Sequence, residues 1–273
     1  MTYGEMAASR RTTEHELRQE MVRIARLMWE KDFVAATDGN LSVRLSADRL
    51  LVTASGLSKG FLTTDDLVVL DLDGQPAGSY RGRGKRASSE IAMHLEVYRQ
   101  RPDVDAVVHA HPPLATAFSI AGMSLARCVI PEVIVTLGSI PTAEYATPGT
   151  GEVPKSIRQA IQGFDALILA HHGSLTVGKS LWEAYLRLEK VEHTAKITMA
   201  AQQLGGVHTL AAQDVEKLTA IRRELLQGQG RDLYEDCSVC ILGDDHNVPF
   251  AALDEAALVQ RIAQSVVQTI RNP

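Results

Sequence analysis

Residues 105–111 read DAVVHAH, and residues 166–178 read ALILAHHGSLTVG. In both segments a short apolar run leads into histidines, which predicts buried strands that end in polar groups. Side chains two positions apart on a strand lie on the same side, so His109 and His111 can reach one metal ion. His171 or His172 offers a third imidazole from a neighbouring strand. Three imidazoles with an open fourth position describe a catalytic zinc site, although such histidines also occur in cores and turns.

Helix and strand patterns alternate around these two runs. Thr13 and Glu16 have the spacing of a helix capping box, and apolar residues then recur at helical spacing. Because most of the predicted strands follow one another too closely for a helical crossover, we expect a largely antiparallel sheet with helices packed on its faces. Helices are predicted at 13–33, 88–99, 112–119, 181–204 and 214–226, and strands at 41–45, 50–53, 67–72, 105–108, 133–137 and 166–170.

Three polar segments beside these elements have the composition of anion-binding sites. Residues 39–42 (GNLS) and 53–56 (TASG) are turns whose backbone N–H groups can bind oxyanions. Residues 88–90 (SSE) open a helix, where free N–H groups and the helix dipole favour anions. The alternatives are simple chain reversal by the turns and N-capping by a serine. The basic loop at 81–86 (RGRGKR) suits either a phosphorylated substrate or plain solvation.

The composition excludes several classes of protein. The 273 residues suit one large domain or two small ones, and 28 Lys and Arg against 33 Asp and Glu give a net charge of -5. A surface that coats nucleic acid would need a basic excess. No apolar run reaches the roughly 20 residues of a membrane span, and the polar N-terminus lacks the apolar stretch of a signal peptide. We therefore expect a cytoplasmic protein that binds neither nucleic acid nor membranes.

The cysteines point to the same compartment. There are three, at positions 128, 237 and 240, and an odd, low count favours a reducing environment over a disulfide-stapled fold. Cys237 and Cys240 have the spacing of a metal knuckle, but no second pair of this kind lies nearby. Reduced thiols are therefore the simpler interpretation.

The order of six motifs resembles the class II aldolase/adducin family, most closely its branch of L-fuculose-1-phosphate aldolases. The resemblance covers about residues 13–228 and implies an α/β fold, a three-layer αβα domain with a central, mostly antiparallel sheet. It also implies a homotetramer with active sites between subunits. The motifs are GNLS (39–42), VTASG (52–56), SSE (88–90), DAVVHAH (105–111), IPTAEYATPGT (140–150) and ALILAHHGSLTVG (166–178).

The resemblance also implies roles for individual residues. His109, His111 and His172 match the zinc ligands, with His171 as a neighbour. Glu90 matches the catalytic acid/base and lies beside the metal, close enough to be a further ligand. The implied reaction is the reversible, zinc-dependent cleavage of a ketose 1-phosphate to dihydroxyacetone phosphate and an aldehyde such as L-lactaldehyde, with other divalent metals able to replace zinc. The positions that match the phosphate-binding residues are Gly39, Asn40, Ser55, Gly56, Ser88 and Ser89.

Two departures from the family pattern leave the exact reaction open. Residues 127–138 contain no tyrosine where the aldolases have one that assists the leaving aldehyde, and Glu132 lies near the matching place. Tyr234 in the tail is a candidate for a second catalytic tyrosine. Epimerase, dehydratase and decarboxylase branches share the scaffold, although the glutamate at position 90 favours an aldolase over the pentose-phosphate epimerases. A non-catalytic, adducin-like assembly module would be expected to lack metal ligands or the acid, and all four are present.

The C-terminal part differs in character from the body. Residues 229–250 form a polar tail and linker, and residues 251–273 predict one amphipathic helix. Such a helix cannot bury its apolar stripe alone, so it must dock on its own body, on a neighbouring subunit or on a partner. The segment ALVQRIAQSVVQTI resembles the encapsulation peptides of bacterial microcompartments. That resemblance implies a shell protein as partner through residues 251–271 and a location inside such a compartment.

Overall fold

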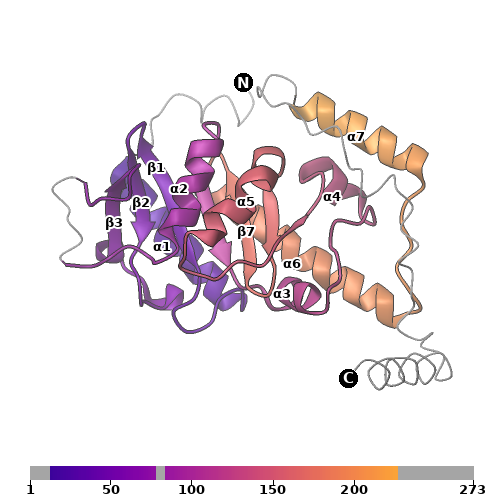
Figure 1. Cartoon of the computed structure of the whole chain (residues 1–273), viewed down its shortest axis with the longest axis horizontal. Helices are drawn as coiled ribbons and strands as arrows, with labels where there is room; N and C mark the ends of the chain where they lie inside the picture. The colour runs from indigo at the N-terminus through magenta and orange to yellow at the C-terminus, as the bar shows by residue number, and fades with distance from the viewer. Residues whose placement is uncertain (1–12, 78–83, 227–273) are drawn as a thin grey trace, which may run out of the picture.

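The computed structural model describes residues 13–77 and 84–226 (Figure 1). Within these ranges seven strands form one sheet in the order β3-β2-β1-β4-β7-β6-β5. All neighbouring strands are antiparallel except β5 and β6, which confirms the mostly antiparallel sheet. The strands are β1 (Asn40–Ser46), β2 (Arg49–Thr53), β3 (Leu67–Asp71), β4 (Ala106–Ala110), β5 (Thr142–Ala143), β6 (Ala166–Leu169) and β7 (Gly173–Gly178).

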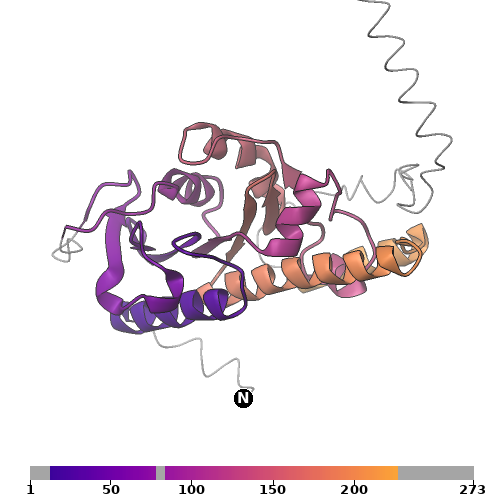
Figure 2. The ribbon, with the colours of Figure 1, turned by 90° about the horizontal axis from the view of Figure 1, so that it is seen from below.

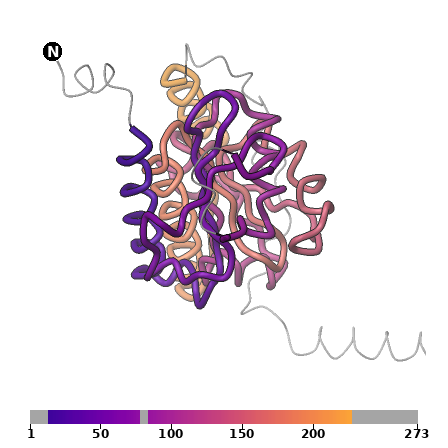
Figure 3. Tube along the Cα trace, turned by 90° about the vertical axis from the view of Figure 1, so that its left-hand side faces the viewer, coloured from indigo at the N-terminus to yellow at the C-terminus, as the bar shows by residue number. Residues whose placement is uncertain are grey.

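Helices cover both faces of the sheet and make three layers. Side chains alternate along β4, so Val107 packs with α2 and α5 while Ala106 and Val108 pack with α1 and α6. Figures 2 and 3 show α1 and α5 on opposite sides of the sheet. The α-helices are α1 (Glu14–Glu30), α2 (Ile91–Gln100), α3 (Pro113–Ile120), α4 (Pro131–Thr136), α5 (Glu152–Gly163), α6 (Leu181–Gln203) and α7 (Ala212–Leu226), and the 3-10 helices are η1 (Lys59–Phe61) and η2 (Thr64–Asp66).

The predicted capping box at the first helix is confirmed. The Thr13 hydroxyl accepts a hydrogen bond from the Glu16 backbone N–H at 3.2 Å, and the Glu16 carboxylate accepts one from the Thr13 N–H at 2.8 Å. Among the described helices, none combines the length and the apolar character that crossing a membrane requires. The predicted linker 229–250, the predicted helix 251–273 and Tyr234 lie outside the described residues.

The strand predicted at 133–137 is wrong, because this segment belongs to helix α4, Pro131–Thr136. A short apolar run suits a strand or a buried helix equally well, and the proline in the first turn preorganises a helix. The helix faces two apolar clusters at once. Val133 and Leu137 pack with α3, β6 and α6, whereas Ile134 packs toward α7.

Three elements were not predicted, namely α5, β5 and β7. Val153, Ile157 and Ile161 recur every fourth residue in α5, so its signal was present in the sequence. The two residues of β5 are too few for a period. Cys128, buried between α4 and α7, is disulfide-bonded, so the reduced state expected from the cysteine count does not hold for it.

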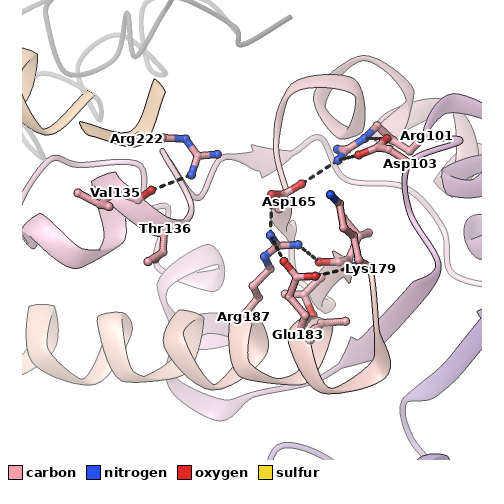
Figure 4. A network of polar contacts seen from close by, with 12 residues as sticks. Arg101, Asp103, Val135, Thr136, Asp165, Lys179, Glu183, Arg187 and Arg222 are labelled. Carbon is pink, nitrogen blue, oxygen red and sulfur yellow. Dashed lines mark hydrogen bonds and ion pairs between the residues drawn. The ribbon is translucent and has the colours of Figure 1, made fainter. Parts of the chain in front are cut away.

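A buried ionic network ties the two helical layers together at one end of the sheet (Figure 4). Asp165, which precedes β6, has a side chain that is 1% exposed. Its carboxylate lies 2.9 Å from the Arg101 guanidinium at the end of α2 and 3.1 Å from the Arg187 guanidinium of α6. Asp103 also pairs with Arg101, but its side chain is 26% exposed. One buried carboxylate therefore joins helices on opposite faces of the sheet.

Replacing this buried carboxylate is expected to destabilise the fold. Asp165→Asn keeps the shape but leaves two guanidinium groups without their buried counter-charge, so the free energy of unfolding should fall by about 3–5 kcal/mol. The matched control is Asp103→Asn, which removes a partly exposed partner of the same arginine and should cost about 1 kcal/mol or less. Urea unfolding monitored by circular dichroism measures both. Equal losses would contradict the bridging role of Asp165.

Candidate active site

Three histidines meet where β4 ends and β7 begins. His109 lies in β4, His111 follows two residues later, and His172 lies in the turn between β6 and β7. Ala110 of β4 pairs with Ser174 of β7, so the antiparallel register brings the turn beside the end of β4. Candidate ligand nitrogens of the three histidines all lie within 4.8 Å of one another. They form the one group of three or more potential ligand residues found in the described part of the chain.

Neighbouring oxygens orient two of these imidazoles. The Nδ1 atom of His109 donates to the Ser174 carbonyl oxygen at 2.8 Å, since a carbonyl only accepts. The Nδ1 atom of His111 lies 3.4 Å from an Asp38 carboxylate oxygen. Both Nε2 atoms therefore present lone pairs to each other, 3.1 Å apart.

This donor set fits a divalent metal. Two facing lone pairs repel unless a proton or a cation lies between them. Tetrahedral ligands at metal–nitrogen distances of about 2.0–2.1 Å would be separated by about 3.3 Å, close to the observed spacing. His171 is not part of the group. It has a positive φ of 56°, and its ring contacts Tyr145 at a centroid distance of 6.3 Å.

Glu90 lies against the histidines at the position that precedes α2. One carboxylate oxygen, Oε2, is 3.3 Å from His109 Nε2 and accepts a hydrogen bond from the Asn40 amide at 2.8 Å. The other, Oε1, is 3.1 Å from His172 Nε2, is buried, and accepts no hydrogen bond of good geometry in the described structure. Burial raises the pKa of Glu90, but hydrogen bonds and positive charge from His109 and His172, when these imidazoles are protonated, lower the pKa of the carboxyl by more.

A buried chain of hydrogen bonds holds Asn40 in place. Because the Asn40 amide nitrogen donates to Glu90, its oxygen must accept, and it lies 2.5 Å from His94 Nε2. Burial, and then the nearby His109, lower the pKa of His94 to about 3, so the ring is neutral. Its Nδ1 atom therefore accepts from the Ser42 hydroxyl at 2.7 Å, and Tyr98 lies 2.8 Å from that hydroxyl. Every donor in this chain points toward the carboxylate.

These residues border a cavity of about 420 Å³. Glu90, His111 and His172 line it, whereas His109 is fully buried behind them. The positions that were matched to phosphate binding also line it, and they come from the start of β1, the turn after β2 and the start of α2. They are Gly39, Asn40, Ser55, Gly56, Ser88 and Ser89.

Gly39 shows why one of these turns needs glycine. Its φ of 74° lies in the left-handed region, and an added Cβ would approach the His109 carbonyl oxygen to 2.9 Å and a Val34 methyl carbon to 2.5 Å. A side chain here would push β1 away from β4. The glycine therefore lets the turn approach the strand that carries His109.

Three residues of the site escaped the sequence analysis as functional positions. Asp38 and Lys59 line the cavity, and His94 supports Asn40 from beneath. The position of His94 carried a usable signal, since it lies four residues, about one helical turn, after Glu90. Lys59 looks like any surface lysine in the sequence. In contrast, Glu132 is exposed in the first turn of α4 and does not line the cavity.

Comparison with known proteins identifies the class. Residues 19–199 match the family model described as Class II Aldolase and Adducin N-terminal domain, and the chain belongs to this family. It is an enzyme of the class II aldolase type, a carbon–carbon lyase. Relatives with aldolase and decarboxylase names favour this conclusion over the alternative of a non-catalytic assembly module.

Particular relatives carry two different names. The chain is 34% identical over 185 residues to the L-fuculose phosphate aldolase of Methanococcus maripaludis, covering 68% of this chain and 97% of that one. It is 33% identical over 188 residues to the 3-oxo-tetronate 4-phosphate decarboxylase of Escherichia coli, covering 67% and 86%. A solved structure from Escherichia coli, described as a putative aldolase/epimerase/decarboxylase, superposes with a TM-score of 0.68 at 31% identity, covering 76% and 99%.

Removing His94 is expected to cost stability. His94→Leu would leave the Asn40 oxygen and the Ser42 hydroxyl without their buried partner, at about 1–3 kcal/mol for each group. Ser42→Ala is the comparison variant: it keeps the contact between His94 and Asn40 and leaves only His94 Nδ1 unpaired, because the Tyr98 hydroxyl can still donate to the Asp105 carbonyl. Its cost should be about half that of His94→Leu. Thermal and urea unfolding measure both variants. A His94→Leu protein as stable as Ser42→Ala would show that the chain of hydrogen bonds does not hold Asn40.

Proposed function

We propose that the protein is a zinc-dependent aldolase that reversibly cleaves a ketose 1-phosphate to dihydroxyacetone phosphate and an aldehyde such as L-lactaldehyde. The observation that carries this proposal is the contact of Glu90 with His109 and His172 at the wall of a cavity that is otherwise lined by small polar turns. His109, His111 and His172 would hold the metal. Bound there, zinc would supply Lewis acidity that stabilises negative charge on the oxygens next to the reacting carbon.

Glu90 would move the proton at the reacting carbon. In the direction of condensation, the Glu90 carboxylate accepts a proton from the hydroxymethyl carbon of dihydroxyacetone phosphate, which leaves an enediolate. That carbon then forms a bond to the aldehyde carbon, the π electrons of the aldehyde C=O move to its oxygen, and that oxygen takes up a proton from water. Oε1 of Glu90 has a free lone pair that can accept the carbon-bound proton, because Asn40 engages only Oε2. Cleavage runs the same steps in reverse, with the protonated Glu90 returning the proton to carbon.

Phosphate binding would position the substrate. The turns at 39–40 and 55–56 and the two serines before α2 would bind the phosphate through backbone N–H and hydroxyl groups. Binding at this remote group would hold the reacting carbon against Glu90 and the histidines.

Decarboxylation of a 3-oxo acid phosphate is the second candidate. Loss of carbon dioxide from 3-oxo-tetronate 4-phosphate leaves the same enediolate, and a proton taken up from water and passed on by Glu90 gives the same dihydroxyacetone phosphate. This reaction releases no aldehyde and so needs no acid for an aldehyde oxygen. Two observations favour it: no tyrosine lines the cavity among the described residues, and a relative bears this activity in its name. An epimerase is supported only as one of three activities in the description of a similar solved structure, and a dehydratase has no such observation in its favour.

Product analysis separates the two reactions. The zinc-loaded protein is incubated with L-fuculose 1-phosphate, L-rhamnulose 1-phosphate and 3-oxo-tetronate 4-phosphate, with an EDTA-treated control. Release of aldehyde with dihydroxyacetone phosphate indicates an aldolase, whereas release of carbon dioxide indicates a decarboxylase. Either activity should vanish when the metal is removed. In Glu90→Gln, kcat should fall about 100- to 10,000-fold while the metal content stays unchanged. Glu132→Gln, on the exposed side of α4, is the control. Full activity of Glu90→Gln would contradict the proposed proton transfer.

The resemblance seen in the sequence supports two further proposals on assembly. We propose a homotetramer with active sites between subunits, and a tail, residues 251–271, that binds a microcompartment shell protein. Sedimentation of the purified protein tests the first, and co-sedimentation of the full chain with shell protein tests the second. A monomer, or a chain that stays in solution beside sedimenting shell protein, would overturn the respective proposal.

A further inference from the structure

Lys59 joins the turns at 39–40 and 55–56, both of which line the cavity. It begins η1 and is 2% exposed, and its Nζ atom donates to the carbonyl oxygens of Thr37 and Leu57, both at 2.7 Å. Thr37 precedes the turn at 39–40, and Leu57 follows the turn at 55–56. One amine therefore spans two segments that approach each other from different strands.

This arrangement is costly for a side chain with only a structural role. Taking an ammonium group out of water is unfavourable unless it is well paired, and no carboxylate of the described residues lies within ion-pair distance of Nζ. Burial lowers the pKa of Lys59 to about 8, while Asp38 and Glu90 act in the opposite direction. An ammonium group has three N–H donors, and the two carbonyls use two of them. The third N–H of the Lys59 ammonium group is left to donate to a ligand, and the Lys59 side chain lines the cavity.

The charges around the cavity indicate what the third donor can serve. Asp38 and Glu90 contribute carboxylates, and the six positions matched to phosphate binding are all uncharged. Within the described ranges, Lys59 is the only lysine or arginine that lines the cavity. A phosphate dianion that enters beside two carboxylates is bound more tightly when a cation lies nearby, because charge-assisted hydrogen bonds are about twice as strong as neutral ones.

We propose that Lys59 binds the substrate's phosphate group, supplying its positive charge while it holds the turns at 39–40 and 55–56 at the spacing that a phosphate requires. The inference rests on the proposed function for the identity of the ligand. It makes Lys59 the residue that selects phosphorylated over unphosphorylated substrates. The histidines and Glu90 would be untouched by its loss.

The test measures phosphate binding apart from turnover. Inorganic phosphate is titrated into the zinc-loaded protein by calorimetry, for the wild type and for Lys59→Gln, whose amide still donates to a carbonyl but carries no charge. The dissociation constant should rise about 10- to 100-fold, as expected for losing a hydrogen bond to a charged group, with zinc content unchanged. The KM of the phosphorylated substrate should rise similarly, with a smaller change in kcat. Lys179→Gln, an exposed lysine outside the cavity, is the control.

Each outcome decides one of the two proposals. A folded Lys59→Gln protein that binds phosphate as tightly as the wild type overturns the role of Lys59 and leaves the proposed function standing. Weakened phosphate binding in a protein that turns over no sugar phosphate supports Lys59 and removes the proposed function. If Lys59→Gln does not fold, the wild type labelled with 15N-lysine is titrated with phosphate. A shift of the slowly exchanging buried ammonium signal supports the proposal, and an unchanged signal overturns it.

Discussion

The pairing of β4 with its two neighbours is the constraint on which the site depends. On one side Ala110 pairs with Ser174 of β7, and on the other His109 pairs with Asn40 of β1. Both pairings are antiparallel, so the end of β4 lies beside the beginning of β7 and the beginning of β1, where these three central strands terminate. The three histidines and Asn40 therefore converge without any long loop. The carbonyl of Ser174 that flanks this pairing also orients the imidazole of His109.

The polar side chains beneath the cavity form a chain of hydrogen bonds that favours the ionised form of Glu90. His94 is neutral, so it can donate to Asn40 on one side and accept from Ser42 on the other. Because the Asn40 oxygen accepts from His94, it is the Asn40 amide NH2 group that faces Glu90 and donates to it. A carboxylate that receives such a donor and faces two imidazoles remains ionised despite its burial. The interior of the protein thus fixes a carboxylate at the wall of the cavity, with Oε2 bound to Asn40 and Oε1 left to accept a hydrogen bond.

The two candidate reactions share everything that this site provides. Cleavage of an aldol and loss of carbon dioxide both leave an electron pair on the same carbon of a phosphorylated ketone, and both end with a proton delivered there. The two reactions differ in the leaving group, which is an aldehyde in one and carbon dioxide in the other. This explains how relatives with aldolase and decarboxylase names can share about a third of their residues with the same chain.

The sequence by itself determined most of the secondary structure, and it predicted the histidines, Glu90 and the polar turns that the structure brings together at one cavity. Its periodicity predicted α1, α2, α3 and α6, and its motif order predicted the family, because these signals are local or depend only on chain order. It failed at 133–137, where an apolar run suits both a strand and a helix, and only packing between two clusters selects the helix. It also passed over Lys59 and did not show what His94 contacts. Both act through partners 22 and 54 positions away in the chain. Only the tertiary structure decides which distant carbonyl or amide a buried amine or imidazole meets, because that choice depends on strand register and on the cost of leaving a buried polar group unpaired.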